Sequence, residues 1–246
     1  MAKYGVVLPA AGKSSRFRGF RQKKPFVELR KRPVWVRTAE CFVDREDVAQ
    51  TVLVVSPDDI EWFREKFRPN LAFMDVTVVE GGATRAESVK RGLAALNDEV
   101  DHIAVHDAAR PLLTQEWVSR IFEAGVTHAA AIPGLKISST VKRLAEDSTI
   151  AETVDRTSLV LAQTPQVFER TVLENAFKLC RDWKNATDEA SVVEQSGHPV
   201  HVIDGWPMNI KITTQDDFRL AELFVDALPK PRGLGSLHPF ADEQLR

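Results

Sequence analysis

The sequence predicts an α/β fold with a mostly parallel sheet, because short apolar runs alternate along the chain with segments of helical periodicity. Each run is short and largely bounded by polar or turn residues, as buried strands are. Such alternation is typical of parallel strands joined by crossover helices. With 246 residues and 43% hydrophobic content, the chain can bury one sizeable core. We expect one domain over residues 1–228, and a loose tail rich in Pro and Gly over residues 229–246.

The patterns place the elements in order. Strands are predicted at Val6–Leu8, Thr51–Val55, Val76–Val79, Ile103–Val105, Ala129–Ile132, Val200–Ile203 and Asn209–Ile212. Helices are predicted at residues 34–43, 58–67, 86–96, 169–183 and 216–227, and Thr187-Asp188-Glu189 is predicted to begin another. Thr84 and Glu87 fit a capping box before the third of these helices.

Residues 136–160 interrupt this alternation. Two extended runs, Lys136–Leu144 and Ile150–Asp155, are separated by five polar or small residues, which predicts a β-hairpin or arm inserted in the main fold. The edges and the single apolar face of such an arm need something to bury them. We therefore expect it either to cover a site or to embrace a partner subunit.

The loop after the first strand is typical of a phosphate-binding segment. Its small residues Ala10, Ala11 and Gly12 leave backbone N–H groups exposed, and nine Lys or Arg stand against one acid between Lys13 and Arg32. The alternative is an ordinary strand-to-helix turn with a solvated basic face. The loop has neither the dinucleotide fingerprint nor a P-loop, so the pattern indicates nucleotide binding by another design. A net charge of −2 favours a compact polyanion such as a triphosphate over nucleic acid.

Further candidate residues follow other predicted strands. Gly81-Gly82 precedes a helix start, where it is either a packing turn or the place for a base or ribose. Asp107 and Arg110 follow Ile103–Val105, where they are either functional or a local ion pair. A carboxylate beside phosphates suggests Mg²⁺ nearby, which makes Asp107 the candidate metal neighbour. Lys211 lies in a β-rich stretch, where a lone Lys is usually an edge residue.

Composition and missing motifs exclude several classes of protein. Cys41 and Cys180 are far apart, which suits reduced thiols in a reducing compartment. No apolar run approaches the length of a membrane helix, so we expect a cytoplasmic protein with no membrane or nucleic-acid partner. The motifs of serine hydrolases, zinc proteases and nicotinamide enzymes are missing. The remaining cations and donors suit transfer to an acceptor that is itself a phosphate, with Mg²⁺ on the triphosphate and no general base.

Ordered motifs extend over nearly the whole chain. They are Pro9-Ala-Ala-Gly12 with Arg16, Gly81-Gly82 with Arg85 and Ser88, Val105–Pro111, Thr153–Arg156, Thr164-Pro-Gln166, Thr187–Ser191 and Asn209–Thr213. A chain with this set resembles the 2-C-methyl-D-erythritol 4-phosphate cytidylyltransferases of the non-mevalonate isoprenoid pathway. The resemblance implies a Rossmann-like nucleotidyltransferase fold and a homodimer formed through the β-arm. It also implies transfer of CMP from CTP to methylerythritol phosphate, with release of pyrophosphate.

The resemblance also implies roles for individual residues. Catalysis would fall to Arg16, Lys24, Arg156 and Lys211. The cytidine nucleotide would be held by Ala10, Ala11, Gly12, Lys24, Gly82, Ser88, Asp107 and Ala108. The sugar phosphate would be oriented by Arg110, Thr140, Arg156, Thr164, Thr187 and Lys211, with Thr140 and Arg156 reaching across from a partner subunit.

The sequence departs from the family pattern at two places. Lys23-Lys24-Pro25-Phe26 stands where the family has Pro-Lys-Gln and an aromatic residue, so Lys23 competes with Lys24 for the catalytic position. Ala83 replaces an acid that often follows the Gly-Gly pair. Two alternative functions remain open: a related nucleotidyltransferase with another phosphate acceptor, and a nucleotide-binding homologue that has lost catalysis.

Overall fold

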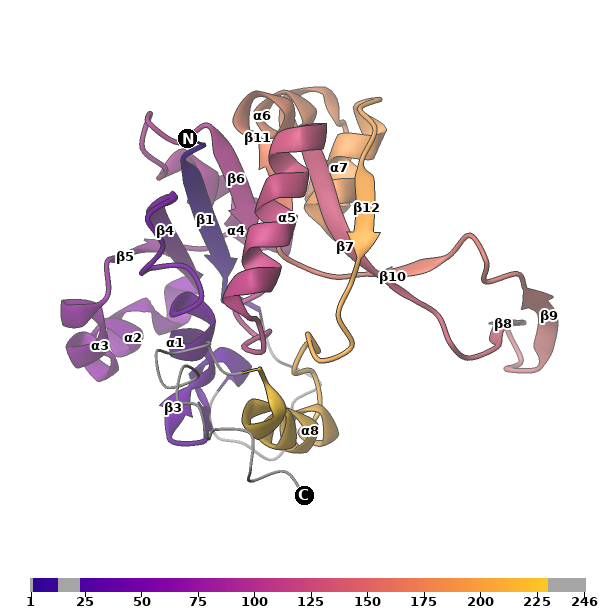
Figure 1. The fold of residues 1–246 in the computed structure, drawn as a ribbon, viewed down its shortest axis with the longest axis horizontal. Helices are drawn as coiled ribbons and strands as arrows, with labels where there is room; N and C mark the ends of the chain where they lie inside the picture. Colours follow the sequence, from indigo (N-terminus) through magenta and orange to yellow (C-terminus); the bar gives the residue numbers. More distant parts are fainter. Residues whose placement is uncertain (1, 13–22, 230–246) are drawn as a thin grey trace, which may run out of the picture.

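An eight-stranded sheet forms the centre of the computed structural model, which describes residues 2–12 and 23–229 (Figure 1). The strand order is β10-β7-β11-β6-β1-β4-β5, and β12 pairs with β7. The strands are β1 (Tyr4–Pro9), β4 (Val48–Val55), β5 (Val76–Glu80), β6 (His102–Val105), β7 (Ala130–Lys136), β10 (Val160–Ala162), β11 (Gln166–Glu169) and β12 (His201–Asp204). Four pairings are parallel, β1 with β4, β1 with β6, β4 with β5 and β7 with β12, whereas the three pairings of β10 and β11 with their neighbours are antiparallel. The sheet is therefore mostly parallel.

Helices cover both faces of this sheet, and the alternating side chains of β1 explain why. Val6 and Leu8 join one buried cluster with α1, α2 and α5, whereas Val7 joins another with α4, α6 and α7. A strand that is buried on both faces needs apolar residues throughout, as β1 has. The helices are α1 (Val34–Ala39), α2 (Ile60–Lys66), α3 (Arg68–Phe73), α4 (Arg85–Ala94), α5 (Gln115–His128), α6 (Arg170–Leu179), α7 (Glu189–Gln195) and α8 (Gln215–Ala227). None of the helices within the described residues is long and apolar enough to cross a membrane.

Three short 3₁₀ helices complete the helical elements of the described chain: η1 (Lys24–Phe26), η2 (Pro57–Asp59) and η3 (Trp183–Asn185). Two strands of two residues each, β2 (Glu28–Leu29) and β3 (Arg32–Pro33), pair with each other beside α8. A third apolar cluster forms there, in which Leu29, Leu112 and Ile212 contact Phe218 and Ala221 of α8. This cluster holds α8 near the carboxyl ends of the parallel strands.

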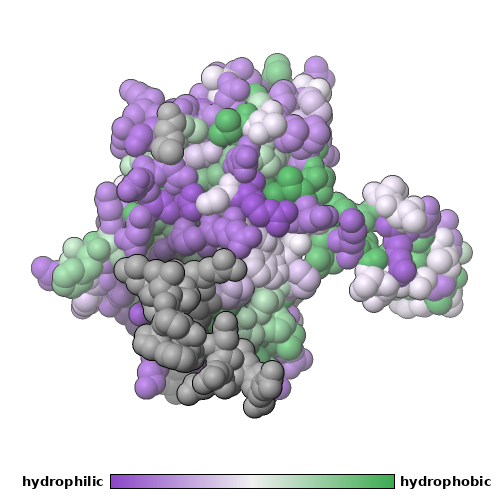
Figure 2. All heavy atoms as spheres, in the orientation of Figure 1, coloured by the Kyte–Doolittle hydropathy of each residue, from purple (hydrophilic) through white to green (hydrophobic). Residues whose placement is uncertain are grey.

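The arm leaves the body between β7 and β10 and projects well away from the sheet (Figure 1). Its tip is the antiparallel pair β8 (Val141–Leu144) and β9 (Ile150–Val154). Figure 2 shows hydrophobic as well as hydrophilic residues on its visible surface, and the side chains of Leu144 and Ile150 at its tip are more than half exposed. The predicted hairpin is confirmed, and it carries apolar surface that its own chain leaves uncovered.

The other predictions from sequence are mostly confirmed, with four differences. Asn209–Ile212 is not a strand: the Ile212 N–H donates to Ala109 O, but the segment makes no ladder with a neighbour. The helix that begins at Val34 ends at Ala39, before the expected residue 43. The helix predicted to span 169–183 ends at Leu179, and a short 3₁₀ turn follows. The pattern also missed α5. Its N-cap is Thr114, whose side chain accepts a hydrogen bond from the Trp117 N–H.

Candidate active site

Four parallel strands end at one cavity of about 650 Å³. Residues 9–12 follow β1, residues 56–58 follow β4, residues 81–85 follow β5, and Asp107 and Ala109 follow β6. Residues 23–25, Ser88, Arg91 and Lys211 complete the described lining. Ligands of open α/β sheets bind at the carboxyl edge of the strands, and a cavity of this size suits a small-molecule ligand. The geometry therefore places the candidate site where the sequence predicted it.

The loop after β5 closes tightly against the loop after β1. A Cβ built on Gly81 would lie 2.6 Å from the Ala11 Cβ and 2.9 Å from Ser88 Oγ, so no larger residue fits there without a shift. The Ser88 hydroxyl accepts from the Gly82 N–H at 3.1 Å and donates to Thr84 O at 2.9 Å. Gly82 and Ser88 are thus held together in one wall of the cavity with Ala11.

The start of α4 confirms only half of the predicted capping box. Thr84 Oγ1 accepts from the Glu87 N–H at 3.1 Å, as expected for an N-cap. The Glu87 carboxylate instead accepts from the Ala83 N–H at 2.9 Å, one residue before the cap. This bond fixes the loop at Ala83, the position at which the sequence departs from the family pattern.

Asp107 is buried and faces three cations from three segments of the chain. Its Oδ2 lies 3.2 Å from Arg110 Nε and 3.0 Å from Lys211 Nζ, and its Oδ1 lies 3.6 Å from Arg85 Nε. Burial acts to raise the pKa of the Asp107 carboxyl, but the three cations together outweigh burial and hold this pKa well below its usual range. Asp107 is therefore ionised at neutral pH and fixes the positions of the cations around it.

The Asp107–Arg110 motif was interpreted from sequence either as a local ion pair or as part of a functional site, and both interpretations are consistent with this arrangement. Arg110 forms the local ion pair and also donates from Nη1 to Asn209 O at 2.8 Å, yet it does not line the cavity. Lys211 is part of the cavity wall and is not a lone edge residue, because its ammonium pairs with Asp107. The ion pair and the functional site are thus one structure.

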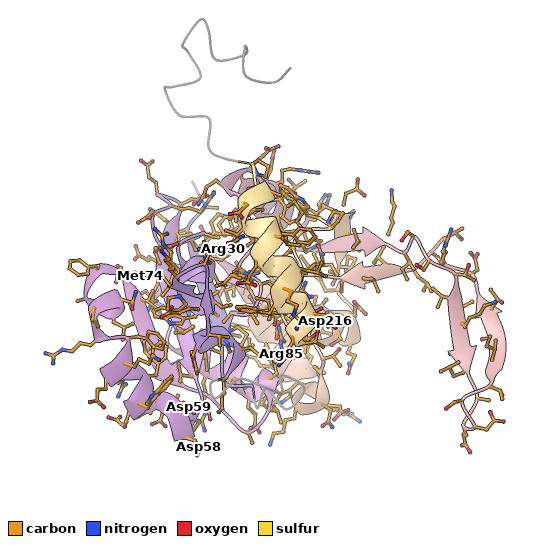
Figure 3. All side chains as sticks on the ribbon, turned by 90° about the horizontal axis from the view of Figure 1, so that it is seen from below. Arg30, Asp58, Asp59, Met74, Arg85 and Asp216 are labelled. Carbon is orange, nitrogen blue, oxygen red and sulfur yellow. The ribbon has the colours of Figure 1, made fainter. Side chains whose placement is uncertain are left out.

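Lys23 and Lys24 differ in what surrounds them. The Lys23 ammonium lies 2.5 Å from Asp59 Oδ2, in an ion pair between the N-cap of η1 and η2. Both lysines line the cavity, but Lys24 is buried, in the first turn of η1. Figure 3 shows Asp58 and Asp59 to one side of the molecule and Arg85 nearer its middle. Arg16, the other cation predicted in this region, lies outside the described residues.

Thr164 and His106 brace the loop beneath Asp107. His106 is fully buried, and its Nε2 lies 2.9 Å from Arg110 O, a carbonyl that can only accept. Burial lowers the pKa of His106 to about 4, so the ring is neutral with its proton on Nε2. The bare Nδ1 then accepts from the Thr164 hydroxyl at 2.9 Å, while that hydroxyl accepts from the Asp107 N–H at 3.1 Å. The Thr164 proton is therefore already used inside the protein.

The remaining predicted residues do not all meet at the cavity. Ala10 is buried in its wall, whereas Ala108 lies behind it and accepts from Thr38 Oγ1 at 3.0 Å. Thr187 is exposed just before α7. Thr140 and Arg156 are exposed on the arm, where Arg156 donates to Ser138 O, and neither lines the cavity of its own chain.

The donor set around the cavity fits a metal ion that arrives with phosphates better than a resident one. Within the described residues, no group of three His, Cys, Asp or Glu side chains could hold a metal. Asp107 offers one carboxylate, and its oxygens already face three cations. Mg²⁺ is commonly held by one or two carboxylates together with substrate phosphates. Phosphate oxygens would thus have to supply most of its ligands here.

Two functional candidates were missed from sequence: Arg85 and Glu189. Arg85 lines the cavity and makes two hydrogen bonds to the buried Glu189 carboxylate, at 2.6 and 3.0 Å. Both residues stand inside recognisable motifs, but an acid in the first turn of a helix is ordinary. The two residues are 104 positions apart, so the folded structure was needed to pair them.

Comparison with known proteins gives one consistent family. The model of the family described as IspD, 2-C-methyl-D-erythritol 4-phosphate cytidylyltransferase, matches residues 4–227. Curated relatives of that name from Rhodopirellula baltica and Symbiobacterium thermophilum are 38% and 39% identical to this chain. The first alignment covers 92% of this chain and 96% of the relative, and the second covers 90% and 92%.

Solved structures agree with the sequence comparison. A structure described as 4-diphosphocytidyl-2C-methyl-D-erythritol synthase is 34% identical with a TM-score of 0.76, and covers 92% of this chain and all of its own. The 2-C-methyl-D-erythritol 4-phosphate cytidylyltransferase of Thermus thermophilus is 28% identical with a TM-score of 0.74, at 92% and 100% coverage. The fold is thus the Rossmann-like nucleotidyltransferase fold. Because the matched residues include the whole described cavity as well as the arm, the chain belongs to the 2-C-methyl-D-erythritol 4-phosphate cytidylyltransferase family.

Proposed function

We propose that this chain transfers CMP from CTP to 2-C-methyl-D-erythritol 4-phosphate, forming 4-diphosphocytidyl-2-C-methyl-D-erythritol and pyrophosphate. Family membership supports the reaction. The observation that carries it in this molecule is the meeting of Lys24, Asp107 and Lys211 in one cavity at the carboxyl edge of the sheet.

The reaction requires charge neutralisation more than proton transfer. An oxygen of the acceptor phosphate attacks the α-phosphorus of CTP, a new P–O bond forms, and the bond to the β-phosphate bridging oxygen breaks. The nucleophile is already anionic near neutral pH, so repulsion between anions is the main barrier. Cations fixed in advance stabilise the charge that develops without reorganising, and the ion pairs around Asp107 fix three of them.

The cavity offers distinct surfaces to the two substrates. In the proposal, residues 10–12, Gly82 and Ser88 hold the cytidine nucleotide, and Arg16 with Lys24 contacts its triphosphate. Lys211 orients the acceptor phosphate, together with Thr187 before α7. Arg110, Ala108 and Thr164 act from behind the wall, because their polar groups bond to other parts of the protein.

Mg²⁺ belongs to the proposal as a companion of CTP. When bound, it would neutralise triphosphate oxygens and orient the α-phosphate for attack. Of the two carboxylates in the described lining, Asp58 and Asp107, we propose Asp107 as the neighbour of the ion, and it would reach the ion directly only by releasing one of its cations. The free thiols Cys41 and Cys180 suit a reducing compartment, so we place the reaction in the cytoplasm.

The arm is proposed to complete the site of a second copy of this chain. Thr140 and Arg156 are exposed away from their own cavity, and the arm also exposes apolar Leu144 and Ile150. A symmetric homodimer would bury this surface and bring both polar residues to the neighbouring cavity.

The test is a pyrophosphate-release assay with varied nucleotides and acceptors. Release should require CTP, methylerythritol phosphate and Mg²⁺ together. Turnover with UTP and a hexose 1-phosphate, but none with the proposed pair, would instead assign a related nucleotidyltransferase. Binding of CTP without turnover of any acceptor would assign an inactive homologue.

A further inference from the structure

Glu189 is a buried carboxylate that does not line the cavity, although its partner does. Its side chain is 1% exposed, and both of its oxygens accept from Arg85. Burial raises the pKa of the Glu189 carboxyl above its usual range, although attraction to the Arg85 guanidinium opposes this change. With two charge-assisted hydrogen bonds in a fork-to-fork geometry, the pair is ionised at neutral pH.

The backbone around Glu189 is fixed independently of Arg85. Gln166 Oε1, on β11, accepts from the Glu189 N–H at 3.1 Å and the Ala190 N–H at 2.9 Å. Gln166 Nε2 donates to Asp188 Oδ2 at 2.8 Å, and Asp188 Oδ1 caps α7 by accepting from the Ser191 N–H. The start of α7 is thus anchored to the sheet, and the Glu189 side chain extends from it toward α4.

Arg85 uses the rest of its guanidinium group toward the cavity. Its two terminal nitrogens bind Glu189, while its Nε lies 3.6 Å from Asp107 Oδ1. Since a guanidinium is planar and rigid, fixing two nitrogens on Glu189 also fixes the direction of the third. Glu189 therefore determines how Arg85 faces Asp107, and Asp107 in turn holds the Lys211 ammonium at 3.0 Å.

The balance of charges also indicates that the position of Arg85 depends on Glu189. The cluster contains three cations, Arg85, Arg110 and Lys211, and its two anions are Asp107 and Glu189. Without Glu189, Asp107 would be the only carboxylate in an ion pair with these three cations, although Asp188 also attracts Arg85, and Arg85 would move closer to Asp107. Arg85 and Lys211 would then compete for the same carboxylate.

We propose that Glu189 is a positioning residue for the transfer reaction, acting through Arg85 and Asp107 to place the Lys211 ammonium beside the acceptor phosphate. This inference rests on the proposed function. It adds a connection between the nucleotide loop at the start of α4 and the acceptor side at the start of α7. The competing explanation is that the pair only joins two helices.

The test is a kinetic double-mutant cycle with Arg85→Gln, Glu189→Gln and the double variant. The Glu189→Gln change keeps the shape of the side chain but places an N–H donor against the donors of Arg85. We expect kcat to fall roughly 10- to 100-fold in each single variant. The double variant should be no worse than the poorer single one, because both changes break the same connection.

A binding measurement separates positioning from a loss of the whole site. Calorimetric titration with CTP and Mg²⁺, without acceptor, should give a Kd for Glu189→Gln within about threefold of the unchanged protein. Glu189→Asp keeps the charge on a shorter side chain and should recover part of the lost kcat.

Asp47→Asn is the matched control. Asp47 also forms a two-point pair with an arginine, from Arg45 Nε at 2.9 Å and Nη2 at 2.7 Å, but this pair lies outside the cavity lining. Because the Asp47 carboxylate is 22% exposed and that of Glu189 is 1% exposed, Asp47→Asn should lower the melting temperature no more than Glu189→Gln does, with kcat changed less than about threefold.

Two results would overturn the inference. One is a Glu189→Gln enzyme whose kcat per folded molecule equals that of the unchanged protein. The other is additive losses in the cycle, with the Asp47 control losing as much activity. An unchanged protein that turns over no CTP with methylerythritol phosphate would instead contradict the proposed function itself.

Discussion

The cavity and the arm present their charged residues in opposite ways. Around the cavity, Asp107 and Glu189 are buried, and two of their cations, Arg85 and Lys211, come from segments far apart in the sequence. On the arm, Arg143 pairs with Glu152 across two strands of one hairpin, and both side chains are more than half exposed. Buried pairs fix geometry because breaking one leaves an unpaired charge, whereas exposed pairs are screened by water. The cavity should therefore be organised by its own chain, while the arm depends on what it contacts.

The largest effect should come from the cavity cations, through a contrast between adjacent lysines. Lys24→Ala should lower kcat/KM by about 10²- to 10³-fold, because a fixed cation facing the triphosphate stabilises the transition state. Lys23→Ala should cost less than about tenfold, since the Lys23 ammonium is held by Asp59. Steady-state kinetics with CTP and methylerythritol phosphate measure both. Equal losses, or the reverse order, would contradict the assignment of Lys24.

The second effect concerns the pH at which the cavity floor loses stability. His106 has its pKa lowered by burial to about 4, whereas an unfolded histidine titrates near 6.5. Below about pH 6.5 this histidine binds a proton in the unfolded chain but not in the folded chain. The free energy of unfolding therefore falls as the pH is lowered to about 4. The loss from this group is on the order of 3 kcal/mol. At neutral pH the contribution of His106 to the free energy of unfolding is fully present.

Urea unfolding at several pH values measures this loss of stability in the body of the protein. All five tryptophans lie outside residues 136–160, so their fluorescence reports the body and not the arm. His106→Asn keeps a polar side chain that does not titrate, and its free energy of unfolding should fall less steeply between pH 6.5 and 4.5. An unchanged slope would show that other groups cause the loss.

The third effect tests whether the arm acts on a neighbouring cavity. Arg156→Ala should reduce turnover by about 10- to 100-fold, because an orienting contact to the acceptor phosphate is lost. When mixed and re-associated with Lys24→Ala chains, half of the dimers carry one site with both residues intact. Activity should then recover to about a quarter of that of the unchanged dimer. Verified mixed dimers without recovery would contradict sharing of residues between subunits.

Sequence patterns predicted the edge of the sheet well, because the loops that follow parallel strands must meet there. Asp107 and residues 10–12 could be placed for this reason. Lys211 was less informative, since its role depends on the Asp107 contact and not on its neighbours in sequence. The expected strand at Asn209–Ile212 failed because an alternating pattern does not reveal whether a neighbouring edge is available for pairing. Glu189 could not be identified at all, because its burial against Arg85 arises from tertiary packing.

The smallest effect should come from the exposed pair on the arm. Glu152→Gln removes an ion pair in which Arg143 Nε lies 2.5 Å from Glu152 Oε1, yet water already solvates both groups. The free energy of unfolding should change by less than about 0.5 kcal/mol, and kcat should be unchanged. Urea unfolding and the same kinetic assay measure the two quantities. If this substitution instead cost as much activity as Arg156→Ala, the hairpin charges would be buried in the assembled protein, and the contrast between cavity and arm would hold only for the isolated chain.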